Sequence, residues 1–456
     1  MKKYDAIIIG FGKGGKTLAG DLAGQGKRVA LIEKSRNMYG GTCINVGCIP
    51  TKSLVHSAEL AEAFHFDSFE KKAEFYRASM EEKQRLVEML RQKNYDKVNA
   101  SENADIYDGL GSFVSDHEVK VKSQEGEEIL YGEQIFINTG SEAFVPPIPG
   151  LAQAERAYTS QTLLDLKELP RHLVILGGGY IGLEFASFYA SFGSKVTVIQ
   201  MEDLFIGRED REIADVVKAA LEKKGITFIM SAATKEITGD SDMVKVEYEA
   251  GGRAAFVQGD ALLVATGRRP NTKDLQLDQA GVETLKNGAV KTDENRRSSK
   301  SHIFAMGDVA GGLQFTYVSL DDYRVVKSAL SGGSYTAENR NIPYSVFIDP
   351  PLSRVGLTAD EAKEKGYQNV KSVSLPAPAI PKAQVLQQPT GLLKAVIDGD
   401  TEQILGATLF CSESHEMINQ IKLAMDLGAS YKVLANQIFT HPTMSESLND
   451  LFSAVK

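Results

Sequence analysis

Two stretches of the chain show the same order of apolar, small and polar positions. Each begins with a short apolar run, "DAIIIG" at residues 5–10 or "HLVIL" at residues 172–176, and continues into a glycine-rich turn. A helical pattern follows, and then a second apolar run, "RVALIE" or "KVTVIQ", whose last residue lies 23 positions after the first glycine of the turn. This strand–turn–helix–strand order is the context of a dinucleotide-binding fingerprint. One such motif is weak evidence, but two at equal spacing predict two Rossmann-like units.

The glycines of both turns have the spacing that brings a helix N-terminus to a pyrophosphate. The first glycine permits the tight turn, the second lets the backbone approach the phosphate, and the third lets the helix pack closely on the strand. The alternative is a pair of ordinary glycine turns in front of helices. We predict nucleotide binding by Gly10, Gly12 and Gly15 in the first turn and by Gly177, Gly179 and Gly182 in the second.

The remaining patterns divide the rest of the chain. Residues 58–105 are predicted to be helical, with charge runs such as "EEKQRLVEMLRQK" that are typical of a solvated helix face. "VPPIPG" at 145–150 is a proline-rich junction, and residues 331–343 form a polar, glycine-rich linker. Beyond it, alternating apolar segments such as "GLLKAVID" predict an antiparallel sheet. The predicted fold class is α/β, with two Rossmann-like nucleotide-binding domains and a C-terminal α+β domain.

Composition narrows the class of protein further. The length of 456 residues suits two to four domains. The net charge of −9 gives no indication that the protein binds nucleic acid or an anionic membrane. No apolar run approaches the roughly 20 residues of a membrane span, and the N-terminus reads as a first strand rather than a signal peptide. Three cysteines do not make a secreted disulfide framework, so we expect a cytoplasmic protein with small-molecule partners.

The two units end their second strands differently, and this position meets the adenosine ribose. Glu33 accepts hydrogen bonds from free ribose hydroxyls and repels a 2′-phosphate, which suits FAD or NAD. Gln200 is uncharged, so it bonds a hydroxyl without repelling a phosphate, and no arginine follows before Arg208. The second site is therefore expected to accept NADPH or NADH, with NADPH slightly favoured. The alternative is that Gln200 is a neutral variant without consequence.

Two of the three cysteines lie five positions apart, in "GGTCINVGCIPTKSLVH" at residues 40–56. In a regular helix Cα atoms at this spacing are roughly 8.6 Å apart, whereas a disulfide needs about 4.4–6.8 Å. Cys43 and Cys48 can bridge only across a distorted first turn, which Gly47 and Pro50 permit. A thiol at a helix N-terminus also has a lowered pKa. Two buried structural thiols, or a metal site completed by His56, are weaker alternatives, and we predict no metal site.

Taken with both glycine motifs, the "GD" of "IFAMGDVAGG" and the C-terminal "HPTMSE", the segment "GGTCINVGCIPTK" resembles the flavoprotein disulfide reductases, such as glutathione reductase, dihydrolipoamide dehydrogenase and mercuric reductase. The resemblance covers essentially the whole chain. It implies bound FAD, NADPH or NADH as reductant, a glutathione reductase-like fold and an obligate homodimer. It also implies an FAD-binding domain (1–147 and 263–332), an NAD(P)-binding domain (148–262) and a dimerisation domain (340–456).

The resemblance also implies roles for the residues of the reaction centre. Cys43 would be the thiol that attacks the substrate, and Cys48 the thiolate beneath the flavin. Lys52 and Glu184 would form an ion pair near the flavin N5, and Tyr180 would cover the flavin until nicotinamide displaces it. The acid–base pair, supplied by the partner subunit, would be His441 and Glu446. Imidazole titrates near neutral pH, and a carboxylate five residues on can orient it.

The implied cofactor contacts extend over the first two domains. The FAD would contact Gly10, Gly12, Gly15, Glu33, Thr42, Lys52, Thr139, Gly140 and Asp308, the last holding the ribityl hydroxyls. The nicotinamide nucleotide would contact Gly177, Gly179, Tyr180, Gly182, Gln200 and, in the return crossing "VATGRRPNT", Gly267. Cys411 is predicted to be an inert buried thiol.

Several stretches are similar to one bacterial subgroup, the reactive-chlorine-resistance flavoproteins related to hypothiocyanous acid reductases. They include "MYGGTCINVGCIPTKSLVH", "GGLQFTYVSLDDYR" and "IFTHPTMSESLNDLFSAVK". This implies reduction of hypothiocyanous acid or related host oxidants through a Cys43–Cys48 disulfide. The alternatives are a dihydrolipoamide dehydrogenase, a reductase of Cu(II) or Hg(II), and a redox sensor without turnover. Dihydrolipoamide dehydrogenases usually carry a histidine where Phe439 stands, and mercuric reductases end with a cysteine pair that this chain lacks.

Overall fold

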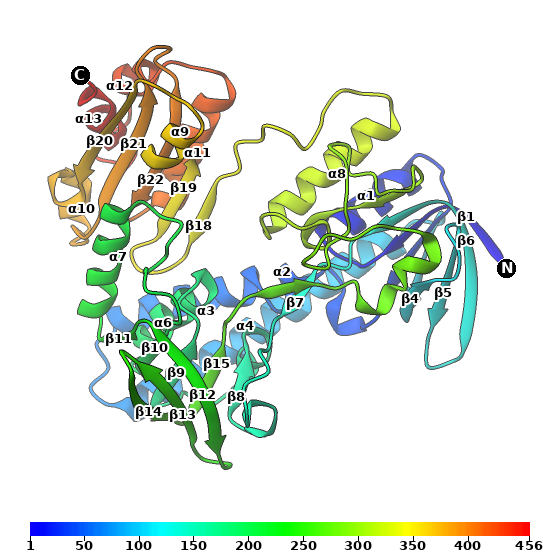
Figure 1. Cartoon of the computed structure of the whole chain (residues 1–456), viewed down its shortest axis with the longest axis horizontal. Coiled ribbons are helices and arrows are strands. Elements are labelled where there is room, and N and C mark those ends of the chain that lie inside the picture. Colours follow the sequence, from blue (N-terminus) through cyan, green and yellow to red (C-terminus); the bar gives the residue numbers. More distant parts are fainter.

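The first predicted nucleotide-binding unit forms the centre of a seven-stranded sheet. In the computed structural model, which describes residues 1–456, the strand order is β3-β2-β1-β6-β5-β4, with β17 beside β6. The parallel part consists of β3 (Ala104–Asp108), β2 (Val29–Glu33), β1 (Lys2–Ile9), β6 (Glu127–Ile137) and β17 (Ile303–Ala305). The antiparallel strands β4 (Leu110–Phe113) and β5 (Glu118–Lys122) extend it. Helix α1 (Lys13–Gly24) packs against α8 (Thr316–Leu330), which Figure 1 shows above this sheet.

The cysteine segment leads into a helical hairpin. A single turn, α2 (Thr42–Asn45), is followed by α3 (Cys48–Ala63) and the long helix α4 (Phe69–Asn99). The predicted helical stretch 58–105 is therefore correct over most of its length. It is wrong at residues 64–68, where Phe64 ends α3 and Ser68 caps α4. It is also wrong at residues 100–105, because α4 ends at Asn99 and β3 begins at Ala104.

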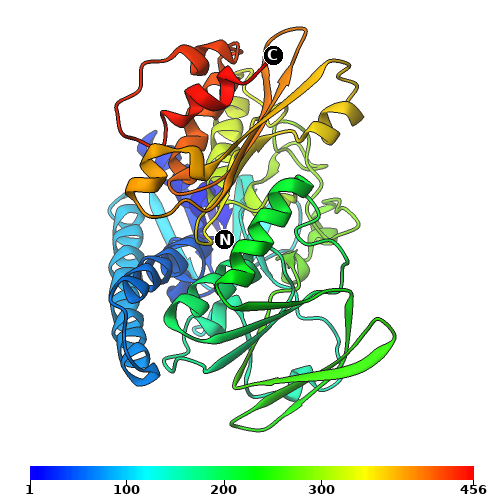
Figure 2. The ribbon, with the colours of Figure 1, turned by 90° about the vertical axis from the view of Figure 1, so that its left-hand side faces the viewer.

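The second predicted unit forms a separate five-stranded parallel sheet, of order β11-β10-β9-β15-β8. Its strands are β11 (Ile226–Ile229), β10 (Lys195–Ile199), β9 (His172–Leu176), β15 (Ala261–Val264) and β8 (Ala157–Thr159), and helices α6 (Tyr180–Phe192) and α7 (Arg211–Lys223) accompany it. An antiparallel sheet of β12 (Ala232–Gly239), β13 (Val244–Ala250) and β14 (Arg253–Gly259) projects from it in Figures 1 and 2. The predicted boundary between residues 262 and 263 falls inside β15.

The C-terminal region contains the antiparallel sheet that the alternating pattern predicts. Its order is β18-β19-β22-β21-β20, made of β18 (Tyr344–Val346), β19 (Leu352–Gly356), β22 (Ile404–Phe410), β21 (Leu392–Asp398) and β20 (Val370–Pro376). Helices α11 (Ser414–Asp426) and α13 (Ser447–Ser453) pack on it. Residues 331–343 cross to this sheet as an extended strap between α8 and β18 (Figure 1). The predicted α/β class with an α+β C-terminal domain is confirmed. None of the helices combines the length and hydropathy of a bilayer span.

Candidate active site

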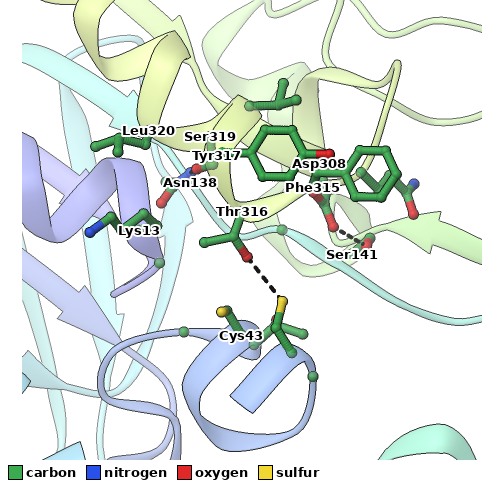
Figure 3. Close-up of a pocket in the computed structure, with 18 of the residues that line it drawn as sticks. Lys13, Cys43, Asn138, Ser141, Asp308, Phe315, Thr316, Tyr317, Ser319 and Leu320 are labelled. Carbon is green, nitrogen blue, oxygen red and sulfur yellow. Dashed lines mark hydrogen bonds between the residues drawn. The ribbon is translucent and has the colours of Figure 1, made fainter. Parts of the chain in front are cut away.

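A cavity of about 1710 Å³ runs from the first glycine turn to the C-terminal domain. This exceeds the roughly 300–1,000 Å³ of common small-ligand pockets and has room for a dinucleotide. Its walls come from all three regions, and both cysteines of the predicted pair line it. Figure 3 shows the Cys43 loop facing the start of α8, with Phe315, Thr316 and Tyr317 on the opposite wall. The cavity thus joins the predicted flavin site to the predicted redox pair.

The first glycine turn is built to receive a pyrophosphate. Gly10 has φ +108°, and a Cβ there would lie 2.3 Å from the carbonyl oxygen of Asn138. A Cβ on Gly15 would lie 2.5 Å from the Gly10 carbonyl oxygen, so helix and strand touch at this point. Gly41, with φ +84°, approaches so closely that its Cβ would lie 2.7 Å from the Cα of Gly12. Gly10 and Gly12 line the cavity, and Gly15 packs behind them.

The ribose end of this site carries a buried carboxylate. Glu33 is 8% exposed, and its Oε2 accepts a hydrogen bond of 3.0 Å from the Phe11 N–H. Burial raises the pKa of the Glu33 carboxyl, while the N–H donors from Phe11 and Ser35 oppose that shift. Each carboxylate oxygen keeps a free lone pair for a hydroxyl group. The residues of this end fit the adenosine of an FAD.

The middle of the cavity holds the other predicted flavin contacts. Asp308 accepts a 2.7 Å hydrogen bond from the Ser141 hydroxyl, as Figure 3 shows, and burial raises the pKa of its carboxyl. Thr139 and Gly140 lie where β6 ends and are held by Asn271, whose N–H donates to the Gly140 carbonyl over 3.0 Å. Thr42 begins α2 on the near wall, beside Cys43. The first glycine turn, the buried carboxylates of Glu33 and Asp308 and the length of the cavity together fit an FAD.

The cysteine pair sits across a break between two helices. Cys43 lies in α2, and Cys48 is the first residue of α3. Between them Gly47 has φ −135° and ψ −118°, and a Cβ there would lie 3.0 Å from the Thr42 carbonyl oxygen. The backbone at Gly47 is therefore distorted from helical geometry, as the sequence predicts. It turns both thiols toward the cavity.

The two thiols differ in acidity. A hydrogen bond from Cys43 lowers the pKa of the Cys48 thiol, helped by the Thr316 hydroxyl, 3.4 Å from its Sγ, and by the charge of Lys52. The same hydrogen bond, together with burial, raises the pKa of Cys43. Both shifts favour the thiolate form of Cys48 over that of Cys43. Burial raises the pKa of the third thiol, Cys411, to about 12, as its predicted inertness requires.

Lys52 and Glu184 connect the cysteine helix to the second unit. The Lys52 Nζ lies 2.6 Å from Glu184 Oε2, so α3 and α6 meet in an ion pair at the cavity wall. The Phe347 N–H donates to Glu184 Oε1 over 2.8 Å, and the Lys52 Nζ lies 4.6 Å from the Phe347 ring centre. Tyr180, at the start of α6, also lines the cavity, and its hydroxyl donates to Glu209 over 2.5 Å.

The second glycine turn repeats the first but opens outside the cavity. Gly177 has φ +101°, and a Cβ on Gly182 would lie 2.1 Å from the Gly177 carbonyl oxygen. Gln200 directly follows β10 and accepts a hydrogen bond of 2.5 Å from the Gly178 N–H. Gly267, with φ +126°, lies in the return crossing. Of the residues predicted to contact the nicotinamide nucleotide, only Tyr180 lines the cavity. Of the others, Gly179 and Gly267 are exposed and Gly182 is buried.

His441 and Glu446 form the expected pair but not beside the cysteines. The His441 Nδ1 lies 2.8 Å from Glu446 Oε2, and the hydrogen bond from His441 lowers the pKa of the Glu446 carboxyl. The His441 side chain is 71% exposed and does not line the cavity of its own chain. Within one chain the structure therefore leaves the cysteines and this pair apart.

Two residues next to the site, Asn138 and Thr316, were not predicted from the sequence. Asn138 accepts from the Gly15 N–H over 2.8 Å and donates to the Met306 carbonyl and the Ser319 hydroxyl, so it fixes the first glycine turn. Its only signal is its place just before Thr139 at the end of an apolar run. Thr316 contacts Cys48 across 268 residues, a contact that only the fold reveals.

One histidine grouping lies away from the cavity. Asp116, His117 and His302 offer ligand atoms within 4.8 Å of one another, although the sequence predicts no metal site. The two imidazole rings stack at 4.0 Å with 9° between their planes. Because ligand lone pairs lie in the ring planes, parallel rings do not direct them to a common ion.

Comparison with known proteins agrees with this architecture. Residues 4–322 match the family model of pyridine nucleotide-disulphide oxidoreductases, and residues 342–452 match that of their dimerisation domain. The chain is 50% identical over full length to the probable pyridine nucleotide-disulfide oxidoreductase RclA of Escherichia coli. It is 34% identical to a dihydrolipoyl dehydrogenase of Bacillus subtilis, covering 98% of this chain and 97% of that protein.

A solved structure gives the same result. The Cu(II) complex of the HOCl-induced flavoprotein disulfide reductase RclA from Escherichia coli superposes with a TM-score of 0.93, at 49% identity and full coverage of both chains. The predicted similarity to the reactive-chlorine-resistance subgroup is confirmed. Proteins of this family use FAD and NAD(P)H, which agrees with the cofactor prediction. This chain belongs to the pyridine nucleotide-disulphide oxidoreductase family and is a flavoprotein disulfide oxidoreductase.

Proposed function

We propose that this enzyme reduces hypothiocyanous acid or a related small oxidant with electrons from NAD(P)H, as part of bacterial oxidative defence. The observation that carries the proposal is a pair of neighbouring cysteines in a cavity whose wall beside Thr316 is formed by stacked aromatic rings. Similarity to a protein described as HOCl-induced supports the same role. A dithiol also persists best in a reducing compartment, which supports a cytoplasmic location.

The arginines that line the cavity are already engaged. Each of the four arginines that line it bonds to an acceptor in its own chain, and these pairs are Arg268 with Ser141, Arg269 with Glu142, Arg324 with Asp321, and Arg340 with Asp321 and Asp322. A peptide disulfide needs cations for its carboxylates, and no free arginine is left for them. A neutral oxidant needs none.

Aromatic rings restrict the approach to the thiols. Phe315 stacks on Tyr317 at 5.3 Å and on Tyr344 at 5.9 Å, with planes 8° and 9° apart. The Tyr317 hydroxyl donates to the Pro343 carbonyl over 2.5 Å, which ties this wall to the extended strap. A wall of fixed rings beside Thr316 favours a substrate of a few atoms over lipoamide or a peptide.

The chemistry balances with the two thiols alone. The Cys43 sulfur attacks the electrophilic sulfur of HOSCN, an S–S bond forms, and hydroxide leaves and takes up a proton to become water. Cys48, held as thiolate, then attacks the Cys43 sulfur and releases thiocyanate, so the dithiol loses two electrons and becomes a disulfide. Overall, the thiol–thiolate pair and HOSCN give disulfide, thiocyanate and water. Bound FAD supplies the two-electron link from NAD(P)H that restores the dithiol.

The acid–base pair requires a second copy of the chain. His441 lies outside the cavity of its own chain, next to exposed apolar residues such as Ile438, which is 96% exposed, and Val433. An apolar surface of this kind indicates a protein interface, and this region matches a dimerisation domain. In the proposed homodimer, His441 of the partner subunit holds the proton that Cys43 gives up.

A second candidate function is reduction of Cu(II). Two adjacent thiols suit soft metal ions, and the similar RclA structure is described as a Cu(II) complex. Lipoamide reduction is a weaker candidate because Phe439 replaces the second histidine of those enzymes.

The test is an acceptor screen with purified yellow holoenzyme. Consumption of NADH and NADPH is followed with HOSCN, Cu(II), Hg(II), lipoamide and glutathione disulfide at matched concentrations. We expect kcat/KM for HOSCN to exceed that for every other acceptor by at least about 100-fold. A higher value for lipoamide or for a metal ion would reject the proposal, and no turnover with any acceptor would favour a redox sensor.

Two variants refine the screen. Cys43→Ser should abolish HOSCN reduction while the protein stays yellow, and retained activity would remove Cys43 from its role. His441→Ala should slow reoxidation of the dithiol by HOSCN more than reduction of the flavin by NAD(P)H, since only the first step needs its proton. Equal slowing of both half-reactions in stopped flow would contradict this assignment.

A further inference from the structure

At the ribose position of the second nucleotide unit, the Gln200 amide is held between a backbone N–H and a neighbouring carboxylate. The Gln200 Oε1 accepts the Gly178 N–H over 2.5 Å, as Glu33 Oε2 accepts the Phe11 N–H over 3.0 Å in the first unit. This hydrogen bond fixes the orientation of the amide, because its oxygen must face the N–H donor. The Gln200 Nε2 therefore points the other way, and there it donates to the carboxylate of Glu202.

Glu202 brings a negative charge to the place where the sequence shows none. One carboxylate oxygen takes the Gln200 hydrogen bond, and the other has no partner. The side chain is exposed, and no lysine, arginine or histidine nitrogen lies within 4.0 Å of it. No basic residue occurs in residues 200–207. The charge is therefore uncompensated.

The backbone of this turn is held on both sides. The Gln200 N–H donates to the Ile229 carbonyl over 2.9 Å, and the Gln200 carbonyl accepts from Ala232 over 2.9 Å. The Glu202 carbonyl accepts the Ser231 N–H over 3.1 Å. The turn is thus tied to β11 and to the start of β12, so the carboxylate stays beside the end of β10, where a ribose binds in this fold.

We propose that Glu202 makes this enzyme select NADH over NADPH, with Gln200 as the positioning residue that holds its carboxylate. The free Glu202 oxygen accepts the 2′-hydroxyl of NADH. A 2′-phosphate at the same place brings about two negative charges against an unpaired carboxylate. This reverses the slight preference for NADPH that Gln200 alone suggests. The inference does not depend on which oxidant the enzyme reduces.

The experiment measures binding as well as turnover. Isothermal titration of the oxidised holoenzyme with 5′-AMP and 2′,5′-ADP gives the effect of the 2′-phosphate without chemistry, and KM for NADH and NADPH gives it under turnover. We expect wild type to favour the unphosphorylated ligand by about 10- to 100-fold. Glu202→Gln should tighten 2′,5′-ADP about 10-fold and weaken 5′-AMP up to about threefold. The matched control Asp203→Asn removes the adjacent exposed charge and should leave both ratios as in wild type.

Gln200→Leu tests the positioning role. It should lower the NADH preference mainly by raising KM for NADH, because Glu202 loses its tether and the ribose loses an amide. A fall in kcat at unchanged KM would instead show a structural role and overturn the positioning assignment. Wild type that binds 2′,5′-ADP more tightly than 5′-AMP, or equal ratios in Glu202→Gln and wild type, would overturn the proposal as a whole.

Discussion

The two nucleotide-binding units share a backbone and differ in how much protein covers their phosphate ends. Gly12 and Gly179 precede their helices with nearly the same conformation, φ −68° and −75° with ψ 177° in both. In the first unit, a Cβ on Gly12 would lie 2.6 Å from Asn138 Oδ1, and that side chain together with Ser319 accepts helix N–H groups. In the second unit no side chain caps α6, and a Cβ on Gly179 would meet nothing within 4 Å.

This difference matches two kinds of ligand. The first unit closes over its site with Gly41, Asn138 and the start of α8, as a cofactor that stays bound requires. The second unit leaves its helix N-terminus open to solvent, as a reductant that leaves after each turnover requires. The same fold therefore serves a resident and an exchanging nucleotide, and the residues around the turn, rather than the glycines, set the difference.

The strongest test exchanges the two central glycines for alanine. Gly12→Ala should yield colourless protein with a lowered Tm, since its Cβ displaces the Asn138 side chain, which makes three buried hydrogen bonds. Gly179→Ala should retain flavin and the wild-type Tm, because its Cβ has free space, and should weaken NADH binding by about 10-fold or more as the methyl group meets the pyrophosphate. Flavin absorbance, thermal melts and NADH titration measure these effects. Equal flavin loss in both variants would contradict the comparison.

A smaller effect is expected where the first unit is made to resemble the second. Glu33→Gln places an amide where Phe11 and Ser35 donate N–H groups, so one donor loses its acceptor and the ribose loses charge-assisted bonds. We expect FAD to dissociate about 10-fold more readily, measured by flavin fluorescence on dilution. The matched reverse change, Gln200→Glu, should leave flavin retention as in wild type.

The pH dependence of the same variant gives a second readout. Burial raises the pKa of Glu33, so its carboxylate becomes protonated, and a weaker acceptor, at a higher pH than an ordinary glutamate near 4.3. Wild-type FAD affinity should therefore fall as the pH is lowered through that raised pKa. Glu33→Gln, which does not titrate, should lack this step. A pH step of equal size in both proteins would assign it to another group.

Much of the architecture could be predicted because it depends on local patterns. Both glycine turns, their strands and the C-terminal antiparallel sheet follow from periodicity, and the break at Gly47 follows from covalent geometry. The end of α3 at Phe64 was missed, although Ser68, which accepts the Lys71 N–H at the start of α4, is a common helix-capping residue type. The strand β15 was split by a predicted domain boundary because the return crossing has no composition change to mark it.

Site residues could be predicted where the residue type itself indicates the chemistry. They could not be predicted where only packing in space brings a residue into the site. Cys43, Cys48 and Glu33 are recognisable in the sequence, and the structure brings them to one cavity. Thr316 reaches Cys48 only through the packing of α8. The contact between the Gln200 amide and the Glu202 carboxylate was not predicted, because the sequence argument considered only the residue that directly follows the strand.

The smallest expected effect lies where the two units meet, at Cys48, between Thr316 of the first unit and the Lys52–Glu184 pair. Thr316→Val removes a hydroxyl 3.4 Å from the sulfur at nearly constant volume. A lost hydrogen bond to the thiolate of about 1 kcal/mol should raise the pKa of Cys48 by about 0.7 unit. Because the thiolate is the form present above the pKa, the charge-transfer absorbance of the reduced holoenzyme should disappear at a correspondingly higher pH as the solution is acidified. Tyr317→Phe removes a hydroxyl bonded to Pro343 rather than to sulfur, so its titration should match wild type, and a shift there but not in Thr316→Val would place control of the thiolate elsewhere.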